Sequence, residues 1–218
     1  MQASTIQTSV AERIGAQPAS VWTPADFLDL GKRDAVDKAL QRLAHAGTIR
    51  RVQRGLYDIP RVSTLTRKAT VPDYRAIIDA VARRVQAPML IDGLTAANDL
   101  GLSDAVPARM VVHTGARLRP MRVGNLKITF RPTTSRKLYW ASRPAMRIVQ
   151  ALYWLRGIVP QNRDRIIARL RAIVNDPSHG AAIRADLQTG LATLPAWMRE
   201  IVQTVLAPEP AHAKDRTA

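Results

Sequence analysis

Cationic and amide side chains recur in a short segment near the N-terminus, and their chemistry suits an anionic partner that also presents hydrogen-bonding groups. An arginine fork donates paired hydrogen bonds to a phosphate or to the edge of guanine, and a glutamine amide pairs with the edge of adenine. The residues concerned are Lys32, Arg33, Lys38, Gln41, Arg42, Arg50, Arg51 and Arg54. Their types and close spacing predict contacts with double-stranded DNA.

Most of these side chains fall on a segment with helical periodicity. Val36, Leu40 and Leu43 recur on one stripe and leave the charged and amide side chains on the other side. Gly47 stands where a helix of this kind ends. We therefore expect a helix over residues 33–46 that packs through one face and uses the other to enter the major groove or line its rim.

Two short β-prone runs follow this helix. Residues 48–52 and 56–59 flank a turn whose tip is Arg54-Gly55, which predicts a hairpin. Its arginines are expected to contact phosphates or the minor groove. An amphipathic helix beside an incidental hairpin is the alternative, and the combined start, turn and stop signals make it the weaker one.

The segments before this helix complete a recognisable order. Residues 4–14 have apolar side chains at helical spacing, residues 20–22 form a short extended piece, and Thr23 followed by proline begins a second helix over residues 24–30. Gly31 makes the turn into the next helix. Helix, short strand, helix, turn, helix and hairpin is the order of a winged helix-turn-helix domain.

The length and composition allow one large domain or two modest ones. The chain has 218 residues, of which 46% are hydrophobic, enough to bury real cores. Residues 61–72 are polar and weakly patterned and end at a proline, so the domain boundary is placed there. We predict a winged domain over residues 1–66, a basic α+β domain over 67–207, and a disordered tail over 208–218.

The second half mixes helical and β patterns. Residues 73–85 have helical spacing, and residues 118–123 and 126–131 alternate around Gly124-Asn125 as a hairpin with one apolar and one basic face. From residue 145 onward the pattern is helical. The predicted class is α+β: an N-terminal winged helix-turn-helix followed by a C-terminal mixed domain with a small antiparallel sheet and several helices.

The positive charge is concentrated after the first domain. The formal net charge is +16, and no carboxylate occurs between Asp104 and Asp164. One interpretation is a solvated basic face without a partner. The other is a second binding surface, for nucleic acid or for an acidic protein, and the sequence does not distinguish these two partners. The candidate residues of this surface, interpreted below as the antitoxin surface, are Arg117, Arg119, Arg122, Lys127, Arg131, Arg136 and Lys137.

Motifs for catalysis and for cofactor binding are missing from the sequence. There are no cysteines, and the segments typical of phosphate cradles and nucleophile elbows do not occur. The four histidines, His45, His113, His179 and His212, lack the spacing of a metal site. Asp92 and Asp99 are interpreted as a helix cap and a solvated face. We expect no enzymatic activity, no cofactor and no metal.

The aromatic residues of the second half admit two interpretations. Tyr139, Trp140, Tyr153 and Trp154 lie near arginines and could stack on bases, but aromatic residues that border two helices more often belong to the core. The core interpretation is favoured. Trp22 is likewise expected to fill the small core of the winged domain.

The sequence gives no indication of a membrane location. Its apolar runs are too short to span a bilayer, and the N-terminus lacks the layout of a secretion signal. A cytoplasmic protein with no membrane partner is expected.

Three stretches carry a resemblance to a known family. They are VQRGLYDIP, the block DGLTAANDLGLSDAVPARMVVHTGARLRPMRVGNLKITFRPT, and RPAMRIVQALYWL. The sequence resembles AbiEi-type antitoxins of type IV toxin-antitoxin systems. The resemblance implies an autorepressor whose winged domain binds an operator with inverted repeats. It also implies a C-terminal domain that antagonises a nucleotidyltransferase-like toxin, directly or through a shared target, with the basic hairpin and the helices after it as the region concerned.

Other functions stay open. The chain could be an RNA-binding module that protects a target by occupying it, or a winged-helix transcription factor with no toxin partner. A nuclease or nucleotidyltransferase acting on RNA is disfavoured because carboxylates are not clustered for magnesium.

Overall fold

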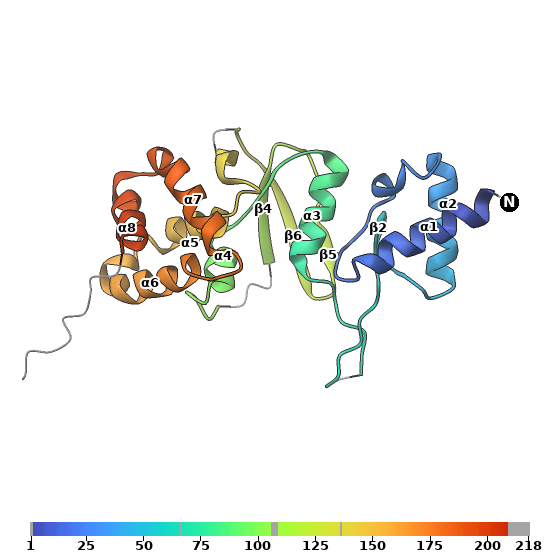
Figure 1. The fold of residues 1–218 in the computed structure, drawn as a ribbon, viewed down its shortest axis with the longest axis horizontal. Coiled ribbons are helices and arrows are strands. Elements are labelled where there is room, and N and C mark those ends of the chain that lie inside the picture. The colour runs from blue at the N-terminus through green and yellow to red at the C-terminus, as the bar shows by residue number, and fades with distance from the viewer. Residues whose placement is uncertain (1, 66, 106–108, 136, 209–218) are drawn as a thin grey trace, which may run out of the picture. The chain divides into compact units, whose positions relative to one another are not determined.

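The computed structural model describes residues 2–65, 67–105, 109–135 and 137–208. The chain divides into two compact units, Met1–Met89 with Ala108–Leu138, and Leu90–Pro107 with Tyr139–Ala218. The predicted boundary near residue 66 falls inside the first unit, and the predicted tail lies outside the described residues apart from Pro208. Helices and small sheets are both present, so the predicted α+β class is confirmed (Figure 1).

The N-terminal part of the first unit combines helices with a two-stranded hairpin (Figure 1). Its elements are α1 (Gln2–Ala16), the 3₁₀ helix η1 (Pro24–Phe27), α2 (Arg33–His45), β1 (Arg50–Gln53) and β2 (Leu56–Asp58). Trp22 N donates to Tyr57 O at 2.8 Å and Tyr57 N donates to Trp22 O at 2.9 Å. The extended piece around Trp22 therefore pairs with the hairpin.

The expected helix over residues 24–30 is only one turn of 3₁₀ helix. Thr23 and Asp26 form a capping box at its start. Asp26 N donates to Thr23 O and Leu30 N donates to Phe27 O, which are the tighter i to i+3 bonds of a 3₁₀ turn. Residues 28–30 continue as turns, so the segment does not become an α-helix.

An apolar core holds these elements together. The predicted stripe of α2 is buried, and Trp22 packs against Phe27 with ring centroids 5.3 Å apart. Both expectations are confirmed. The cluster comprises Val10, Ile14, Trp22, Phe27, Val36, Leu40, Leu43, Ile49 and Tyr57. Gly47 follows α2 with a φ of +74°, a conformation that an L side chain would strain.

The segment between the hairpin and the next helix folds back on itself. Thr70 N donates to Arg61 O at 2.7 Å, and Val62 and Ala69 form an antiparallel bridge. The helix α3 (Tyr74–Val85) follows, with Asp73 as its N-cap, because the Asp73 carboxylate accepts from Arg75 N. Ile77, Ile78 and other apolar residues of α3 are buried, as its helical spacing predicted.

The second sheet is mixed, and the predicted antiparallel sheet is wrong in this respect. Its strands are β3 (Met89–Ile91), β4 (Arg109–Thr114), β5 (Met121–Val123) and β6 (Leu126–Pro132), in the order β3-β4-β6-β5. β5 and β6 form the expected antiparallel hairpin, with Gly124 at a φ of +58° in its turn. β4, however, pairs parallel with β6. The connection after β4 places β5 at the edge of the sheet opposite to β3. β6 then runs back between β4 and β5.

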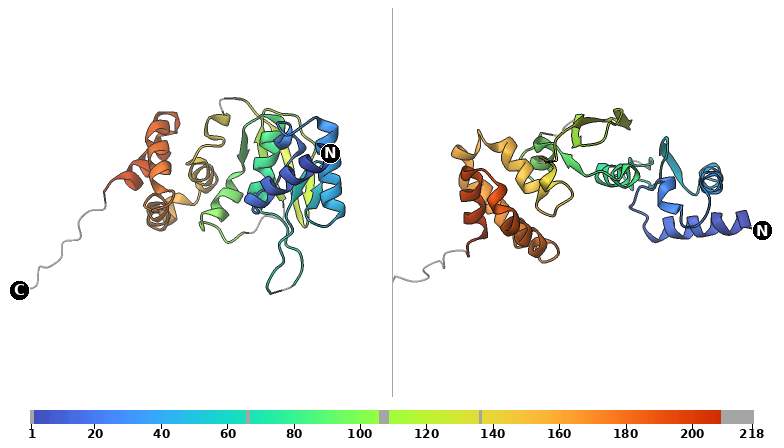
Figure 2. Two further views of the ribbon diagram at one scale, coloured as in Figure 1. Left: turned by 45° about the vertical axis from the view of Figure 1, so that its right-hand side comes forward. Right: turned by 90° about the horizontal axis from the view of Figure 1, so that it is seen from above.

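The second unit is mainly helical. Its helices are α4 (Gly93–Asp99), α5 (Met146–Leu155), α6 (Val159–Val174), α7 (Gly180–Gly190) and α8 (Ala196–Leu206), with 3₁₀ turns η2 (Lys137–Trp140), which begins in the first unit, and η3 (Leu191–Thr193). α6, α7 and α8 lie together in each view (Figures 1 and 2). Asn162 has non-helical dihedral angles inside α6, which marks a kink in this helix.

The aromatic residues of the second unit are only partly core. Trp140 is 5% exposed, as expected, but Tyr139, Tyr153 and Trp154 are 37%, 47% and 41% exposed. The core interpretation is therefore wrong for these three residues. α5 buries Ile148, Val149, Ala151 and Leu152 and packs against α4. Tyr153 lies on the part of α5 that remains exposed.

The two aspartates of α4 differ in role. Asp92 caps the helix, as expected, since its carboxylate accepts from Thr95 N at 3.0 Å. Asp99 is not on a solvated face: its side chain is 7% exposed and forms an ion pair with Arg147 at 3.1 Å. The surrounding sequence holds no sign of this pair, because the partners are far apart in the chain.

Candidate nucleic-acid interface

The predicted recognition residues lie on the exposed side of α2 and at its start. Burial of the apolar stripe turns Lys38, Gln41 and Arg42 outward, and all three are exposed, as are Lys32 and Arg33. Arg33 Nε also contacts Asp37 Oδ2 at 2.9 Å, an exposed pair between neighbouring turns. Such a pair contributes little to stability, so a phosphate can compete for the arginine.

The three hairpin arginines are not equivalent. Arg50 is held by the buried carboxylate of Asp58, with Nε 3.0 Å from Oδ1 and Nη2 2.5 Å from Oδ2. Arg51 and Arg54 are exposed, and Arg54 stands in the turn beside Gly55, whose φ is +73°. The pairing slips between Arg51 and Gln53, which marks a β-bulge at this point. Arg51 and Arg54 are therefore better placed than Arg50 for an external anion.

Asp26 organises the beginning of η1, a role that the sequence interpretation missed. Its carboxylate accepts from Thr23 N at 2.7 Å and contacts Arg83 Nε at 3.0 Å. Arg83 also donates to Val21 O at 2.8 Å. The spacing of Thr23 and Asp26 is a capping-box signal that could have revealed the first half of this arrangement.

The second basic set is partly brought together on the sheet. Arg122, Lys127 and Arg131 are exposed strand residues, whereas Arg117 and Arg119 are exposed in the connection between β4 and β5. Lys137 is exposed at the start of η2, and Arg136 lies outside the described residues. Arg109 was not among the predicted residues, yet it is exposed and lies opposite Lys127 in the strand register. The alternation of Arg109 with buried Met110 and Val112 was the available signal.

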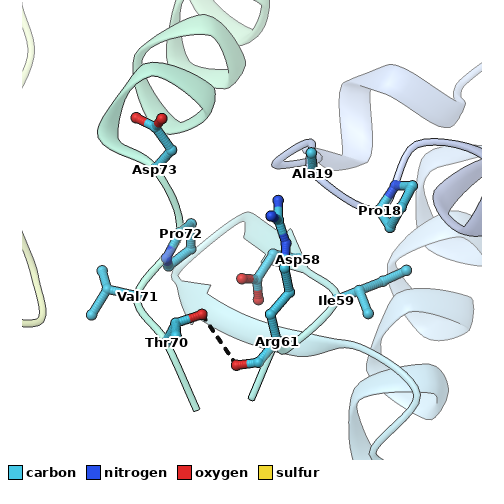
Figure 3. Close-up of a pocket in the computed structure, with 9 residues that line it drawn as sticks. All are labelled: Pro18, Ala19, Asp58, Ile59, Arg61, Thr70, Val71, Pro72 and Asp73. Atoms are coloured by element: carbon cyan, nitrogen blue, oxygen red, sulfur yellow. Dashed lines mark hydrogen bonds between the residues drawn. The ribbon is translucent and has the colours of Figure 1, made fainter. Parts of the chain in front are cut away.

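A pocket of about 320 Å³ lies at the base of the hairpin (Figure 3). Its polar residues include Asp58, Arg61 and Asp73, and Thr70 Oγ1 donates to Arg61 O at 3.1 Å. Asp58 is already paired with Arg50. The described residues that line the pocket include neither histidine nor cysteine nor serine.

Hydrogen bonds lower the pKa of two exposed aspartates of the protein. Arg13 donates to Asp29 through both nitrogens of its fork, at 2.8 and 2.6 Å, and these bonds lower the pKa of the Asp29 carboxyl. Backbone N–H groups of His179 and Ser178 lower the pKa of Asp176 before α7. Both effects favour the charged carboxylate.

Two searches of the described residues complete the account of the site. No group of three or more histidine, cysteine, aspartate or glutamate side chains is arranged to hold a metal ion in the part of the chain that the structure describes. Among the same residues, every helix is too short or too polar to cross a membrane. The expected lack of metal, cofactor and catalysis stays a prediction.

Fold and exposed cationic groups together define an α+β protein with two basic surfaces. The chain belongs to DUF6088, described as a family of unknown function, whose sequence profile matches residues 9–174. It is also similar to the crystal structure of the RV2827C protein from Mycobacterium tuberculosis. That similarity has 19% sequence identity and a TM-score of 0.42, and it covers 92% of this chain and 77% of that chain. No curated protein matches the chain.

Proposed function

We propose that this protein is a sequence-selective regulator that binds double-stranded DNA through a winged helix-turn-helix. In this proposal α2 enters the major groove, and the β1–β2 hairpin is the wing that contacts the adjacent backbone. The observation that carries it is the division of α2 into two faces. Val36, Leu40 and Leu43 are buried, while Lys38, Gln41 and Arg42 project outward.

The arrangement of the neighbouring elements supports the same proposal. The extended piece at Trp22 pairs with β2, as the first strand of a winged domain does, and η1 with its turn precedes α2. Gln41 and Arg42 have the donors and acceptors that read adenine and guanine edges. Arg51 and Arg54 give the hairpin permanent positive charge. In the proposed complex they would lie near phosphates of the duplex that α2 enters.

An antitoxin role is the second part of the proposal. It rests on the resemblance to AbiEi-type antitoxins, and it makes the protein an autorepressor that also antagonises a nucleotidyltransferase-like toxin, directly or through a shared target. A winged-helix transcription factor with no toxin partner is the simpler alternative. If the adjacent gene encodes such an enzyme, co-expression distinguishes the two roles. An antitoxin should restore the growth of cells that produce the enzyme, and a transcription factor with no toxin partner should not.

An RNA-binding protective module is favoured by one specific observation. Tyr153 and Trp154 are exposed aromatic residues in a segment without carboxylates, and such side chains can stack on unpaired bases. A preference for transfer RNA over duplex DNA at matched salt, lost on changing Trp154 to Ala, would establish it in place of the DNA proposal.

Selection from a random duplex library, followed by fluorescence anisotropy, tests the DNA proposal. Replacement of Gln41 or Arg42 by Ala should remove about 1 to 3 kcal/mol of discrimination at one base position. Arg54→Ala should weaken binding to all duplexes and lower the salt slope by about one. Arg199→Ala, an exposed arginine on α8, is the matched control. Wild-type selectivity in both α2 variants, together with a wild-type salt slope in Arg54→Ala, would rule the proposal out.

A further inference from the structure

One face of the second sheet is unusually basic. Side chains alternate across β4, β5 and β6, so that Met110, Val112, Ile128 and Phe130 are buried on one face. The opposite face presents Arg109, Arg122, Lys127 and Arg131, all of which are exposed. We call this second surface, with Val111 and Thr129 between the cations, the basic sheet face.

Three of these cations form a row across the strands. Lys127 of β6 lies opposite Arg109 of β4 on one side and opposite Arg122 of β5 on the other. Adjacent strands are about 4.8 Å apart, so the three residues start within about 10 Å of one another. Like charges placed directly opposite each other destabilise a sheet.

Nothing in these strands offsets the repulsion within the row. Residues 109–132 contain no aspartate or glutamate, so neither β4 nor β5 nor β6 supplies a carboxylate to the row. The repulsion within the row lowers the stability of the sheet. Binding of an external anion would neutralise these charges, which gives the row a function. Three cations in a row that spans about 10 Å can contact more than one phosphate of a polyanion.

We propose that the basic sheet face binds the phosphate backbone of duplex DNA, as a contact separate from α2 and the hairpin. The inference rests on the proposed function in that it names the same class of partner. The face presents Val111, His113 and Thr129 beside its cations, and among residues 109, 111, 113, 122, 127, 129 and 131 the imidazole of His113, which is half-buried and opposite Arg131 in the register, is the only aromatic ring. A single half-buried ring does not provide the series of exposed aromatic side chains on which successive unpaired bases stack.

An acidic protein is the less suitable partner for this face. Protein interfaces place apolar and aromatic groups at their centre, where lysine is depleted although arginine is common. Here Lys127 occupies the centre of the row, with an arginine on either side. Arginine and lysine in this arrangement match phosphate groups, which carry charge without an apolar core.

A charge-matched comparison tests the inference on the full-length chain. The test variant is Arg109→Ala with Arg122→Ala and Lys127→Ala, and the control is Arg163→Ala with Arg165→Ala and Arg199→Ala. Both lose the same charge, and the control residues are exposed on α6 and α8. Anisotropy with a duplex of scrambled sequence is measured over a range of salt, and thermal melts confirm that both variants fold.

The expected result is a selective loss of phosphate contacts. The salt slope of the test variant should fall by about 2.7, which corresponds to three phosphates, and its affinity at low salt should fall by about ten-fold or more. The control should keep a slope close to that of the wild type. Equal losses in both variants would overturn the inference, because net charge alone would explain them.

Two further outcomes are informative. If poly-glutamate displaces duplex DNA from the wild type as effectively as unlabelled duplex at matched charge, the face binds anions without preference for nucleic acid and the inference is overturned. If no sequence preference is found for the wild type but the test variant still loses its slope, the proposed reading by α2 fails while the basic sheet face is supported.

Discussion

Asp58 holds the N-terminal hairpin together by accepting hydrogen bonds from two nitrogens of Arg50, Nε at 3.0 Å and Nη2 at 2.5 Å. The Asp58 side chain is only 6% exposed, and that of Arg50 is 29% exposed. A carboxylate so nearly buried needs a charged partner, since an unpaired buried charge costs several kcal/mol. Arg50 is thus a structural residue of the hairpin, whereas Arg51 beside it faces outward.

Replacement of Arg50 by Ala should therefore act through stability. We expect the free energy of unfolding to fall by about 2 kcal/mol, because Asp58 would be left without its charge-assisted hydrogen bonds. Arg51→Ala, at an exposed position on the same strand, should change it by less than about 0.5 kcal/mol. Urea denaturation measures both. If Arg50→Ala kept wild-type stability while losing DNA affinity, Arg50 would be a DNA contact.

Gly93 should tolerate no side chain. A Cβ built at this position would lie 2.6 Å from Gln150 O and 2.6 Å from Trp154 Cβ, where α4 packs against α5. Gly93→Ala should therefore destabilise the protein by about 1 to 3 kcal/mol, the usual range for overpacking. Gly157→Ala is the matched control, because no atom lies within 4 Å of its Cβ position. Similar urea midpoints for the two variants would contradict close packing at Gly93.

The ion pair of Arg13 and Asp29 should give a pH-dependent contribution. Hydrogen bonds from Arg13 lower the pKa of Asp29 below its ordinary value of 3.8. Because the pKa of Asp29 is lower in the folded state, the ion pair stabilises the protein at pH values above the pKa of the unfolded chain. This stabilisation is lost as the pH falls through the pKa of the folded state. The melting temperatures of the wild type and of Asp29→Asn should therefore differ at neutral pH and converge in strong acid.

A second background checks the source of this dependence. In an Arg13→Gln protein the same Asp29→Asn change should have little pH-dependent effect, because the donor of the bonds is gone. A pH dependence that persists in that background would show that another group lowers the pKa of Asp29.

Local periodicity made the N-terminal part predictable. The stripe of Val36, Leu40 and Leu43 depends only on spacing along one helix, and the same spacing fixes which side of α2 faces outward. The positions of Gly47 and Gly55 follow from backbone conformation, because both have positive φ. These are properties of short segments, which a sequence displays directly.

Long-range pairing was not predictable in the same way. The parallel contact of β4 with β6 depends on where the chain between β4 and β5 leads, and no local pattern encodes that path. The ion pair of Asp99 with Arg147 and the exposure of Tyr153 likewise depend on how α4 meets α5. The alternation along β4 could have indicated that Arg109 is exposed, but only the register places it opposite Lys127.

Replacement of Lys127 by Glu should stabilise the sheet. The new carboxylate would stand opposite Arg109 and Arg122, so two repulsive cross-strand pairs become attractive ones. Each pair contributes roughly 0.2 to 1 kcal/mol, and the gain should shrink as salt screens the charges. Urea denaturation at low and at high salt measures it, with Thr129→Glu, two residues further along β6, as the control. A lower unfolding free energy for Lys127→Glu than for the wild type at low salt would mean that the three cations do not repel one another across the strands.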